Sequence, residues 1–407
     1  MQDVYTNDIK ELAKKAGLQP QEALLEERKH DHNLKIAVPR EITYQENRIP
    51  LTPTAVHLLI NNGHEVIIES GAGLQANFSD KEYSDAGAKI SYNPEELFKC
   101  EIVLKISPPT LEEINWMSQG QILISAIQPT DLKPHYIHEL MNRGVTAIAY
   151  EYLRDEWGSL PVIRSMSEIA GNTCILIGAE YLSNVYGGKG ELLGGITGVP
   201  PTEVIIIGSG TVGEYATRAA LGLGAEVKVF DNSLYRLRRL QNNIGNRIYT
   251  SLLNPKILGK ALTTADIAIG ALRAEDGLTP TVVSENMVKN MKKNSVIIDV
   301  SIDQGGCFDT SEVTTHENPV FTKHDVIHYC VPNISSRVAR TASYALSNIF
   351  STLLLKIANS GGLRKYIWEK NGVRDGIYIY KGRLTNKHIA NRFDIPFKDI
   401  ELLIPTL

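Results

Sequence analysis

The feature that most constrains the fold is a stretch near the middle of the chain, EVIIIGSGTVGEYATRAALGLGAEVKVFD (203–231). An apolar strand runs into the glycine pattern G-x-G-x-x-G, which is followed by a helical segment and a second strand ending at Asp231. In such a pattern, Gly208 makes the tight turn and Gly210 lets the backbone approach a phosphate, while Gly213 permits close packing of helix on strand. The order of these parts predicts one βαβ unit of a doubly wound parallel sheet.

The same stretch predicts a dinucleotide site. The backbone at Thr211 and Val212 opens the helix, and its positive end suits a pyrophosphate. Asp231 follows Gly213 by 18 residues, the spacing at which a carboxylate accepts hydrogen bonds from the adenosine ribose. Its charge opposes a 2′-phosphate, so the pattern favours NAD. A few residues beyond it stand the arginines that would favour NADP if one of them reached a phosphate: Arg236, Arg238 and Arg239.

Short β-branched runs alternate with helical segments along most of the chain, a pattern typical of parallel α/β sheets. Length alone favours two or three domains, because the chain has 407 residues and a domain takes roughly 100–200. We expect two doubly wound Rossmann-like domains with a cleft between them, the substrate domain being discontinuous. The predicted boundaries are a helical arm at 1–33, a substrate domain at 34–161 and 340–407, and an NAD-binding domain at 162–339.

Composition excludes several classes. The formal net charge is −4, which gives no electrostatic basis for nucleic-acid binding. Four cysteines in so long a chain are expected to be buried or free thiols rather than a disulfide framework. We find no signal-peptide core and no run of 18 apolar residues. The sequence therefore predicts a soluble cytoplasmic protein without a membrane span or a metal-binding cluster.

Polar residues that follow predicted strands are candidates for a ligand site, because ligands of open α/β sheets lie beyond the carboxyl ends of the strands. Arg48 has the planar fork that binds a carboxylate. Lys105 could orient a carbonyl group or transfer a proton, and Asp303, in SIDQGG, could activate water. Gln128 follows another apolar run. The GGKG text at 187–190 lacks the spacing of a phosphate-binding loop and indicates a connector.

Many segments together resemble the family of alanine dehydrogenase and the NAD-binding part of transhydrogenase. The resemblance covers about residues 34–360, and LLGGITGVPP and IDQGG favour the alanine dehydrogenase side. The text that carries it is VPREITYQENRIPLTP (38–53), ESGAGL (69–74), IAYEYL (148–153), MSEIAG (166–171), LLGGITGVPP (192–201), IGSGTVG (207–213), IDQGG (302–306) and HYCVPN (328–333).

The resemblance implies a homohexamer that oxidises L-alanine with NAD to pyruvate and ammonia. It places Arg48 on the substrate carboxylate, Lys105 at the active-site lysine and Asp303 beside the nicotinamide. It further places Ser167, Asp231 and Asn333 along the cofactor, with Asn333 also beside the substrate.

The chain departs from the family where the catalytic histidine is replaced by Gln128, which cannot carry a proton. The acidic residue that follows the family's lysine is also missing from KISPP (105–109). Three functional hypotheses therefore stay open. The protein is an amino-acid dehydrogenase acting on alanine or on a larger amino acid, a transhydrogenase-like subunit, or an NAD-binding protein with weak catalysis.

Overall fold

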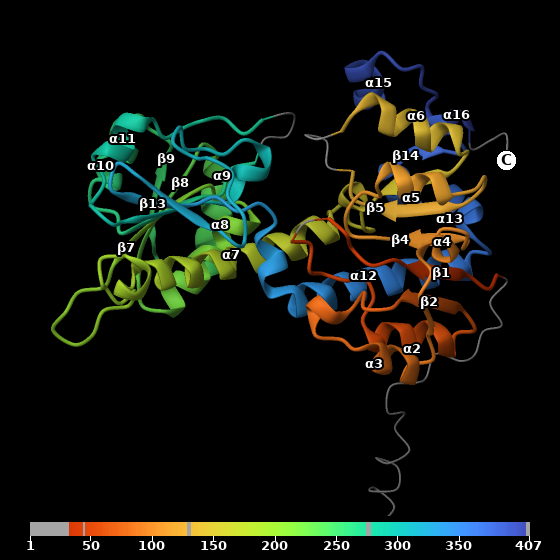
Figure 1. Ribbon diagram of the computed structural model, residues 1–407. Helices are drawn as coiled ribbons and strands as arrows, with labels where there is room; N and C mark the ends of the chain where they lie inside the picture. The colour runs from red at the N-terminus through yellow and green to blue at the C-terminus, as the bar shows by residue number, and fades with distance from the viewer. Residues whose placement is uncertain (1–31, 44, 128–131, 274–277, 404–407) are drawn as a thin grey trace, which may run out of the picture.

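A computed structural model describes residues 32–403, except for 44, 128–131 and 274–277. The chain forms two α/β domains joined by two long helices, α7 (Pro161–Leu182) and α12 (Ala339–Asn359) (Figure 1). Most of the predicted arm at 1–33 and the candidate Gln128 lie outside the described residues.

The first domain contains an eight-stranded sheet in the order β15-β14-β6-β5-β4-β1-β2-β3. The first six strands in the sequence pair in parallel, and the two strands from the carboxyl-terminal part add to the β6 edge in antiparallel orientation. The strands are β1 (Lys35–Val38), β2 (Glu65–Glu69), β3 (Lys89–Ser91), β4 (Ile102–Leu104), β5 (Ile122–Ser125), β6 (Thr146–Ala149), β14 (Ile377–Tyr380) and β15 (Arg383–Leu384).

Helices cover this sheet, and α12 returns from the second domain to pack against α2. The side chains of Phe350, Leu354 and Ile357 on α12 join the same buried core as Ile36 of β1. The domain is therefore built from two separate parts of the chain, as predicted. The remaining elements are α2 (Pro53–Asn61), η1 (Leu74–Ala76), α3 (Asp80–Asp85), α4 (Pro94–Leu97), α5 (Leu111–Trp116), α6 (Pro134–Asn142), η2 (Tyr150–Tyr152), α13 (Leu363–Glu369), α14 (Asn371–Arg374), α15 (Lys387–Phe393) and α16 (Ile400–Leu403).

The second domain contains a seven-stranded sheet in the order β12-β13-β11-β10-β7-β8-β9, parallel except for β12. The strands are β7 (Glu203–Ile207), β8 (Glu226–Asp231), β9 (Tyr249–Leu252), β10 (Ile267–Gly270), β11 (Val296–Asp299), β12 (Val320–Lys323) and β13 (Val326–Tyr329). The helices are α8 (Thr211–Gly222), α9 (Leu234–Ile244), α10 (Pro255–Leu262), α11 (Glu285–Lys289), η3 (Asn184–Tyr186), η4 (Val300–Gln304) and η5 (Ile334–Val338).

Both sheets reverse their strand order at one point, between β1 and β4 in the first domain and between β7 and β10 in the second. Ligands of doubly wound sheets bind outside the carboxyl ends of the strands at such a reversal. The residues that follow β1 and β4, and those that follow β7 and β10, are therefore placed where a functional site is expected. β11, which is followed by Asp303, is the next strand after β10 in the sheet.

All four cysteines are buried and free, as the sequence indicated. No described helix has the length and apolar character needed to cross a membrane. Within the described ranges, no group of His, Cys, Asp and Glu side chains is arranged to hold a metal ion.

Candidate active site

The glycine loop has the geometry that its sequence predicts. Gly208 has φ +112°, and a Cβ there would lie 2.4 Å from the carbonyl oxygen of Ala271. A Cβ on Gly213 would lie 1.9 Å from the carbonyl oxygen of Gly208, so this glycine is required by close packing. By contrast, a Cβ on Gly210 would meet nothing within 4 Å. The space beside Gly210, at the start of α8, therefore fits a pyrophosphate, with the backbone of Thr211 and Val212 at the helix N-terminus.

Asp231 is buried at the end of β8, and its carboxylate is bonded to the glycine loop. Oδ2 accepts hydrogen bonds from the backbone N–H of Ser209 at 2.7 Å and from its hydroxyl at 2.8 Å, while Oδ1 accepts from the backbone N–H of Ser233 at 2.8 Å. Because a carboxylate oxygen can accept two hydrogen bonds, Oδ1 keeps acceptor capacity for a ribose hydroxyl. Arg238 and Arg239 on α9 are exposed, as expected for a solvated helix face.

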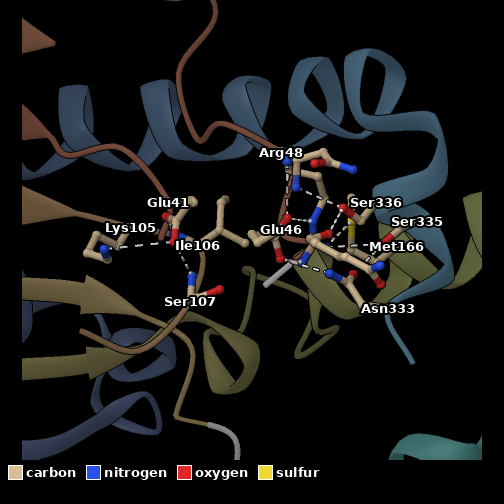
Figure 2. A network of polar contacts seen from close by, with 12 residues as sticks. Glu41, Glu46, Arg48, Lys105, Ile106, Ser107, Met166, Asn333, Ser335 and Ser336 are labelled. Carbon is tan, nitrogen blue, oxygen red and sulfur yellow. Dashed lines mark hydrogen bonds and ion pairs between the residues drawn. The ribbon is translucent and has the colours of Figure 1, made fainter. Parts of the chain in front are cut away.

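Arg48 is the centre of a buried network that joins the two domains (Figure 2). Its Nε and Nη2 atoms donate to the two oxygens of Glu46 at 2.7 and 2.6 Å, a bidentate ion pair. Nη1 donates to the Ser335 hydroxyl at 3.1 Å and contacts Met166 Sδ at 3.4 Å. Asn333 Nδ2 also donates to Glu46, at 2.8 Å. Glu46 therefore holds the predicted substrate arginine and the predicted cofactor residue Asn333 in one arrangement.

One edge of the Arg48 guanidinium, formed by N–H groups of Nη1 and Nη2, remains available to bind a ligand. The second Nη2 hydrogen has no partner within this network, and the Nη1 hydrogen aimed at Met166 meets only a thioether, a weak acceptor. A substrate carboxylate at this edge would exchange a weak sulfur contact for two charge-assisted hydrogen bonds. Ser167, which follows Met166 on α7, is half-buried.

Asp303 lies on η4, directly after β11, and its side chain is open to solvent. Although it is accessible, desolvation by the surrounding protein raises the pKa of Asp303 to about 6, against opposing effects of the Asn333 backbone N–H and of the charge on Arg48. The interaction with Arg48 places the two candidates within electrostatic range of each other. The structure thus brings together Arg48, Asn333 and Asp303, which the sequence alone could only place at strand ends.

Asp303 is positioned by Asp299, the last residue of β11. The carboxylate of Asp299 accepts hydrogen bonds from Ser301 N, Cys307 N and Ser311 Oγ, which fold the 300–307 loop around it. Gly306 has φ +80°, and a Cβ there would lie 2.6 Å from Asp299 Oδ2. Gly306 is therefore required for the loop to wrap around Asp299, and its neighbour Gly305 also has a positive φ, +96°.

Lys105 is fully buried, and its ammonium group is bonded to Glu113 at 2.7 Å, with Glu41 at 3.9 Å. The acidic neighbour that the KISPP text lacks is thus supplied by Glu113, eight residues later on α5. Glu41 accepts hydrogen bonds from the backbone N–H groups of Ile106 and Ser107 at 2.6 and 3.2 Å and fixes the loop after β4 (Figure 2). The lysine of this chain therefore belongs to a buried ion-pair network.

Sequence reasoning missed Glu41, Glu46 and Glu113, the carboxylates that fix Lys105 and Arg48. The short spacing between Glu46 and Arg48 was visible, but a carboxylate two residues from an arginine is common on any surface. Only burial of both partners shows that this pair is part of the site.

An apolar cavity of about 270 Å³ lies next to the loop that carries Lys105. Pro108, Leu111, Ile127 and Tyr136 contribute to its wall, at the N-terminal ends of α5 and α6. It stands at the same carboxyl edge of the sheet as Arg48 and Lys105, so it lies on the side of the domain where a substrate is expected.

Comparison with known proteins decides the family. The family description "Alanine dehydrogenase/PNT, N-terminal domain" matches residues 37–170, and "Alanine dehydrogenase/PNT, C-terminal domain" matches residues 174–387. The chain belongs to the alanine dehydrogenase/PNT family. This confirms the resemblance inferred from the motifs.

Relatives within the alanine dehydrogenase/PNT family match nearly the whole chain. Alanine dehydrogenase 2 of Staphylococcus aureus (strain USA300) is 38% identical over 369 residues, covering 90% of this chain and 99% of the relative. Alanine dehydrogenase of Methanococcus maripaludis is 40% identical over 368 residues, covering 90% and 98%.

Solved structures agree with this assignment. An L-alanine dehydrogenase matches with a TM-score of 0.84 and 36% identity, covering 89% of this chain and 100% of the other. A transhydrogenase from Sinorhizobium meliloti matches with a TM-score of 0.75 at 21% identity, covering 87% and 99%, which shows a shared fold.

Proposed function

We propose that this protein catalyses the NAD-dependent oxidative deamination of L-alanine to pyruvate and ammonia. One observation carries the proposal: a buried arginine with an available guanidinium edge is linked through Glu46 and Asn333 to Asp303, and lies within electrostatic range of it, although Arg48 and Asp303 belong to different domains. An amino-acid dehydrogenase needs this combination, because it must hold the substrate carboxylate and manage protons at the neighbouring carbon. The family relatives support the choice of alanine.

The NAD assignment rests on the glycine loop. The backbone at Gly210, Thr211 and Val212 would cradle the pyrophosphate, while Gly208 makes the turn and Gly213 the close packing that shape the loop. Asp231 would accept from the adenosine ribose. Ser167 and Asn333 would line the nicotinamide end. When bound, the cofactor supplies the acceptor for the hydride that leaves the substrate Cα.

Among the substrate-site residues, Arg48 anchors the carboxylate and Glu46 keeps the guanidinium in place. Asp303, with a pKa of about 6, is ionised at neutral pH and can accept a proton from the water that attacks the imine. Lys105 stays a candidate for orienting the substrate carbonyl, as the sequence predicts, and its ion pairs with Glu113 and Glu41 fix its ammonium group. Gln128, which lies outside the described residues, remains a sequence-based candidate for orienting the substrate.

The test is to incubate the purified protein with NAD and a panel of L-amino acids and to follow the absorbance of the reduced nicotinamide. We expect alanine to be the preferred substrate. Oxidation of another amino acid without alanine turnover would refute the substrate assignment. Tight NADH binding without any turnover would instead favour the hypothesis of an NAD-binding protein with weak catalysis.

The apolar cavity beside Pro108 and Ile127 is the observation that supports a second candidate, a larger apolar amino acid. If the cavity receives part of the substrate, leucine or valine should compete with alanine in the same panel. A matched variant, Leu111→Trp, fills the cavity from α5 and should lower the rate with the larger substrates while leaving the alanine rate unchanged.

We also infer a homo-oligomer, a hexamer by family resemblance. Large apolar side chains are exposed on the loop between α7 and β7: Val185 is 83% exposed, Leu192 67% and Ile196 65%. Several large apolar side chains exposed along one connecting segment favour an association surface there. Sedimentation velocity tests the assembly, and a monomer at micromolar concentration would refute it. The expected cytoplasmic location stays a prediction.

A further inference from the structure

The loss of the family's histidine leaves one proton unaccounted for. An amino acid binds as a zwitterion, and its ammonium group must lose a proton before the Cα–H bond can be broken as a hydride, because only the neutral nitrogen has a lone pair to form the C=N bond. Water activation by Asp303 belongs to the later hydrolysis. A separate group must therefore accept the ammonium proton.

The buried network after β1 and β4 holds three carboxylates and two cations: Glu41, Glu46 and Glu113 with Arg48 and Lys105. When all five are ionised the network has a charge of −1, and burial penalises an uncompensated charge. Arg48 is bonded to Glu46 at 2.6 Å, and Lys105 is bonded to Glu113 at 2.7 Å. The remaining carboxylate, Glu41, has its nearest cation, Lys105, only at 3.9 Å.

Of the three carboxylates in this network, Glu41 is therefore the one whose protonation costs the least free energy. Its side chain is 5% exposed, and burial raises its pKa to about 7. The charge of Lys105 and the N–H groups of Ile106 and Ser107 oppose this rise, and the charge of Glu46 adds to it. Arg48 and the Tyr150 phenol also interact electrostatically with Glu41, and Tyr150 is fixed by a hydrogen bond to the Ile106 carbonyl.

The position of Glu41 fits this role. It stands in the same segment after β1 as Arg48, and the two charged groups lie within electrostatic range of each other. The ammonium group of an α-amino acid is attached to the carbon next to its carboxylate, so it must lie close to Arg48. The other two carboxylates of the network are each already bonded to a cation, Glu46 to Arg48 and Glu113 to Lys105, and Lys105 acts as the hydrogen-bond donor in its pair.

We propose that Glu41 accepts the proton of the substrate ammonium group, in place of the missing histidine. This inference rests on the proposed dehydrogenase function. An N–H bond of the substrate breaks and an O–H bond forms on a Glu41 carboxylate oxygen. The neutral amine then loses the Cα hydrogen with its electron pair to the nicotinamide, which is reduced, and the substrate becomes the iminium ion. Glu41 returns its proton to solvent before the next cycle.

The experiment compares the wild type with Glu41→Gln and Glu41→Asp across pH 6–10 with L-alanine and NAD. Glu41→Gln should lose about 10²–10⁴-fold in kcat near neutral pH. The deficit should shrink as pH rises, because free alanine then arrives with a neutral amine. Glu41→Asp should recover part of the rate. NADH affinity, followed by fluorescence, should stay within about threefold of the wild type. The control is Glu65→Gln, which removes one exposed carboxylate from the same domain.

A deficit that is constant over the whole pH range would assign Glu41 to holding the 105–107 loop and overturn the inference, as would an unchanged rate. An independent measurement is the infrared band of a protonated carboxyl group, titrated between pH 6 and 8. The wild type should show this band and Glu41→Gln should lack it. Its absence from the wild type overturns the inference whatever the activity. An inactive wild type that shows the band refutes the dehydrogenase function and leaves Glu41 as the proton-holding group.

Discussion

The substitution Glu46→Gln removes the charge from a buried ion pair without changing the size of the side chain. Glu46 accepts from Arg48 at two atoms and from Asn333, and its side chain is 4% exposed. A glutamine offers one acceptor oxygen and turns its amide N–H₂ group toward donors. The guanidinium therefore loses its counter-charge in a buried position, where breaking one partner of an ion pair costs about 3–5 kcal/mol.

We take about 3 kcal/mol for this substitution, because one hydrogen bond to Arg48 can persist. For a domain of 150–250 residues, about 2–4 °C of unfolding temperature corresponds to each kcal/mol, so Tm should fall by about 6–12 °C. The KM for alanine should rise, because the anchor is no longer held, whereas NADH affinity should change little. Differential scanning calorimetry and steady-state kinetics provide both measurements.

Glu65→Gln is the matched control. Glu65 also pairs with two cations, Lys35 at 3.5 Å and Lys89 at 2.5 Å, but the lysines are 65% and 69% exposed. Such surface pairs contribute about 0–1 kcal/mol. If Glu46→Gln lowers Tm no more than Glu65→Gln does, the buried Arg48–Glu46 ion pair contributes no more to stability than a surface pair, which contradicts the prediction.

Three further predictions concern the glycine loop, Asp303 and Glu41. Gly210→Ala should fold normally but weaken NADH binding in fluorescence titration, because its Cβ enters the open phosphate space, whereas Gly213→Ala should lower Tm through the 1.9 Å clash with Gly208; equal effects in both assays would contradict this division. Asp303→Asn should abolish turnover with NADH binding retained, and wild-type kcat should fall below about pH 6 as Asp303 is protonated; retained activity would remove Asp303 from the mechanism. The folded-state pKa of Glu41, about 7, lies above its ordinary value of 4.5, so its contribution to stability is present below pH 4.5 and is lost as pH rises through 7. Compared with Glu41→Gln, the wild type should therefore lose on the order of 3 kcal/mol of unfolding free energy in urea between pH 4.5 and 8, and parallel pH curves for the two proteins would refute the assignment.

Local sequence was sufficient for the parts of the fold that depend on neighbouring residues. The strand, glycine turn and helix from β7 to α8 follow from spacing alone, and α2 begins at Pro53, a residue type favoured at the first position of a helix. Thr52 is at the N-cap of α2, where threonine commonly caps a helix, but its hydroxyl bonds to Ser347 of α12 instead. A contact between residues so far apart in sequence cannot be read from local pattern.

In the candidate site, too, local sequence predicts some features, whereas contacts between distant residues determine others. Arg48 and Asp303 were found because polar residues at strand ends are expected near ligands. Their surroundings were not predictable, since Ser335, which binds Arg48, is 287 residues away along the chain. The raised pKa of Glu41 depends on burial and on charged groups from several elements, and residue spacing in the sequence does not reveal these.

The placement of Arg48 has a mechanical consequence. The chain passes between the domains through α7 and through η5 and α12, and Arg48 contacts both crossings, through Met166 and Ser335. A point close to a pivot moves least when the two bodies turn about it. Any rotation of the nucleotide domain about these crossings would therefore swing the glycine loop and the far strands through a long arc, while the carboxylate anchor stays almost stationary. The substrate would therefore stay bound near the rotation axis, and the cofactor would move with the nucleotide domain.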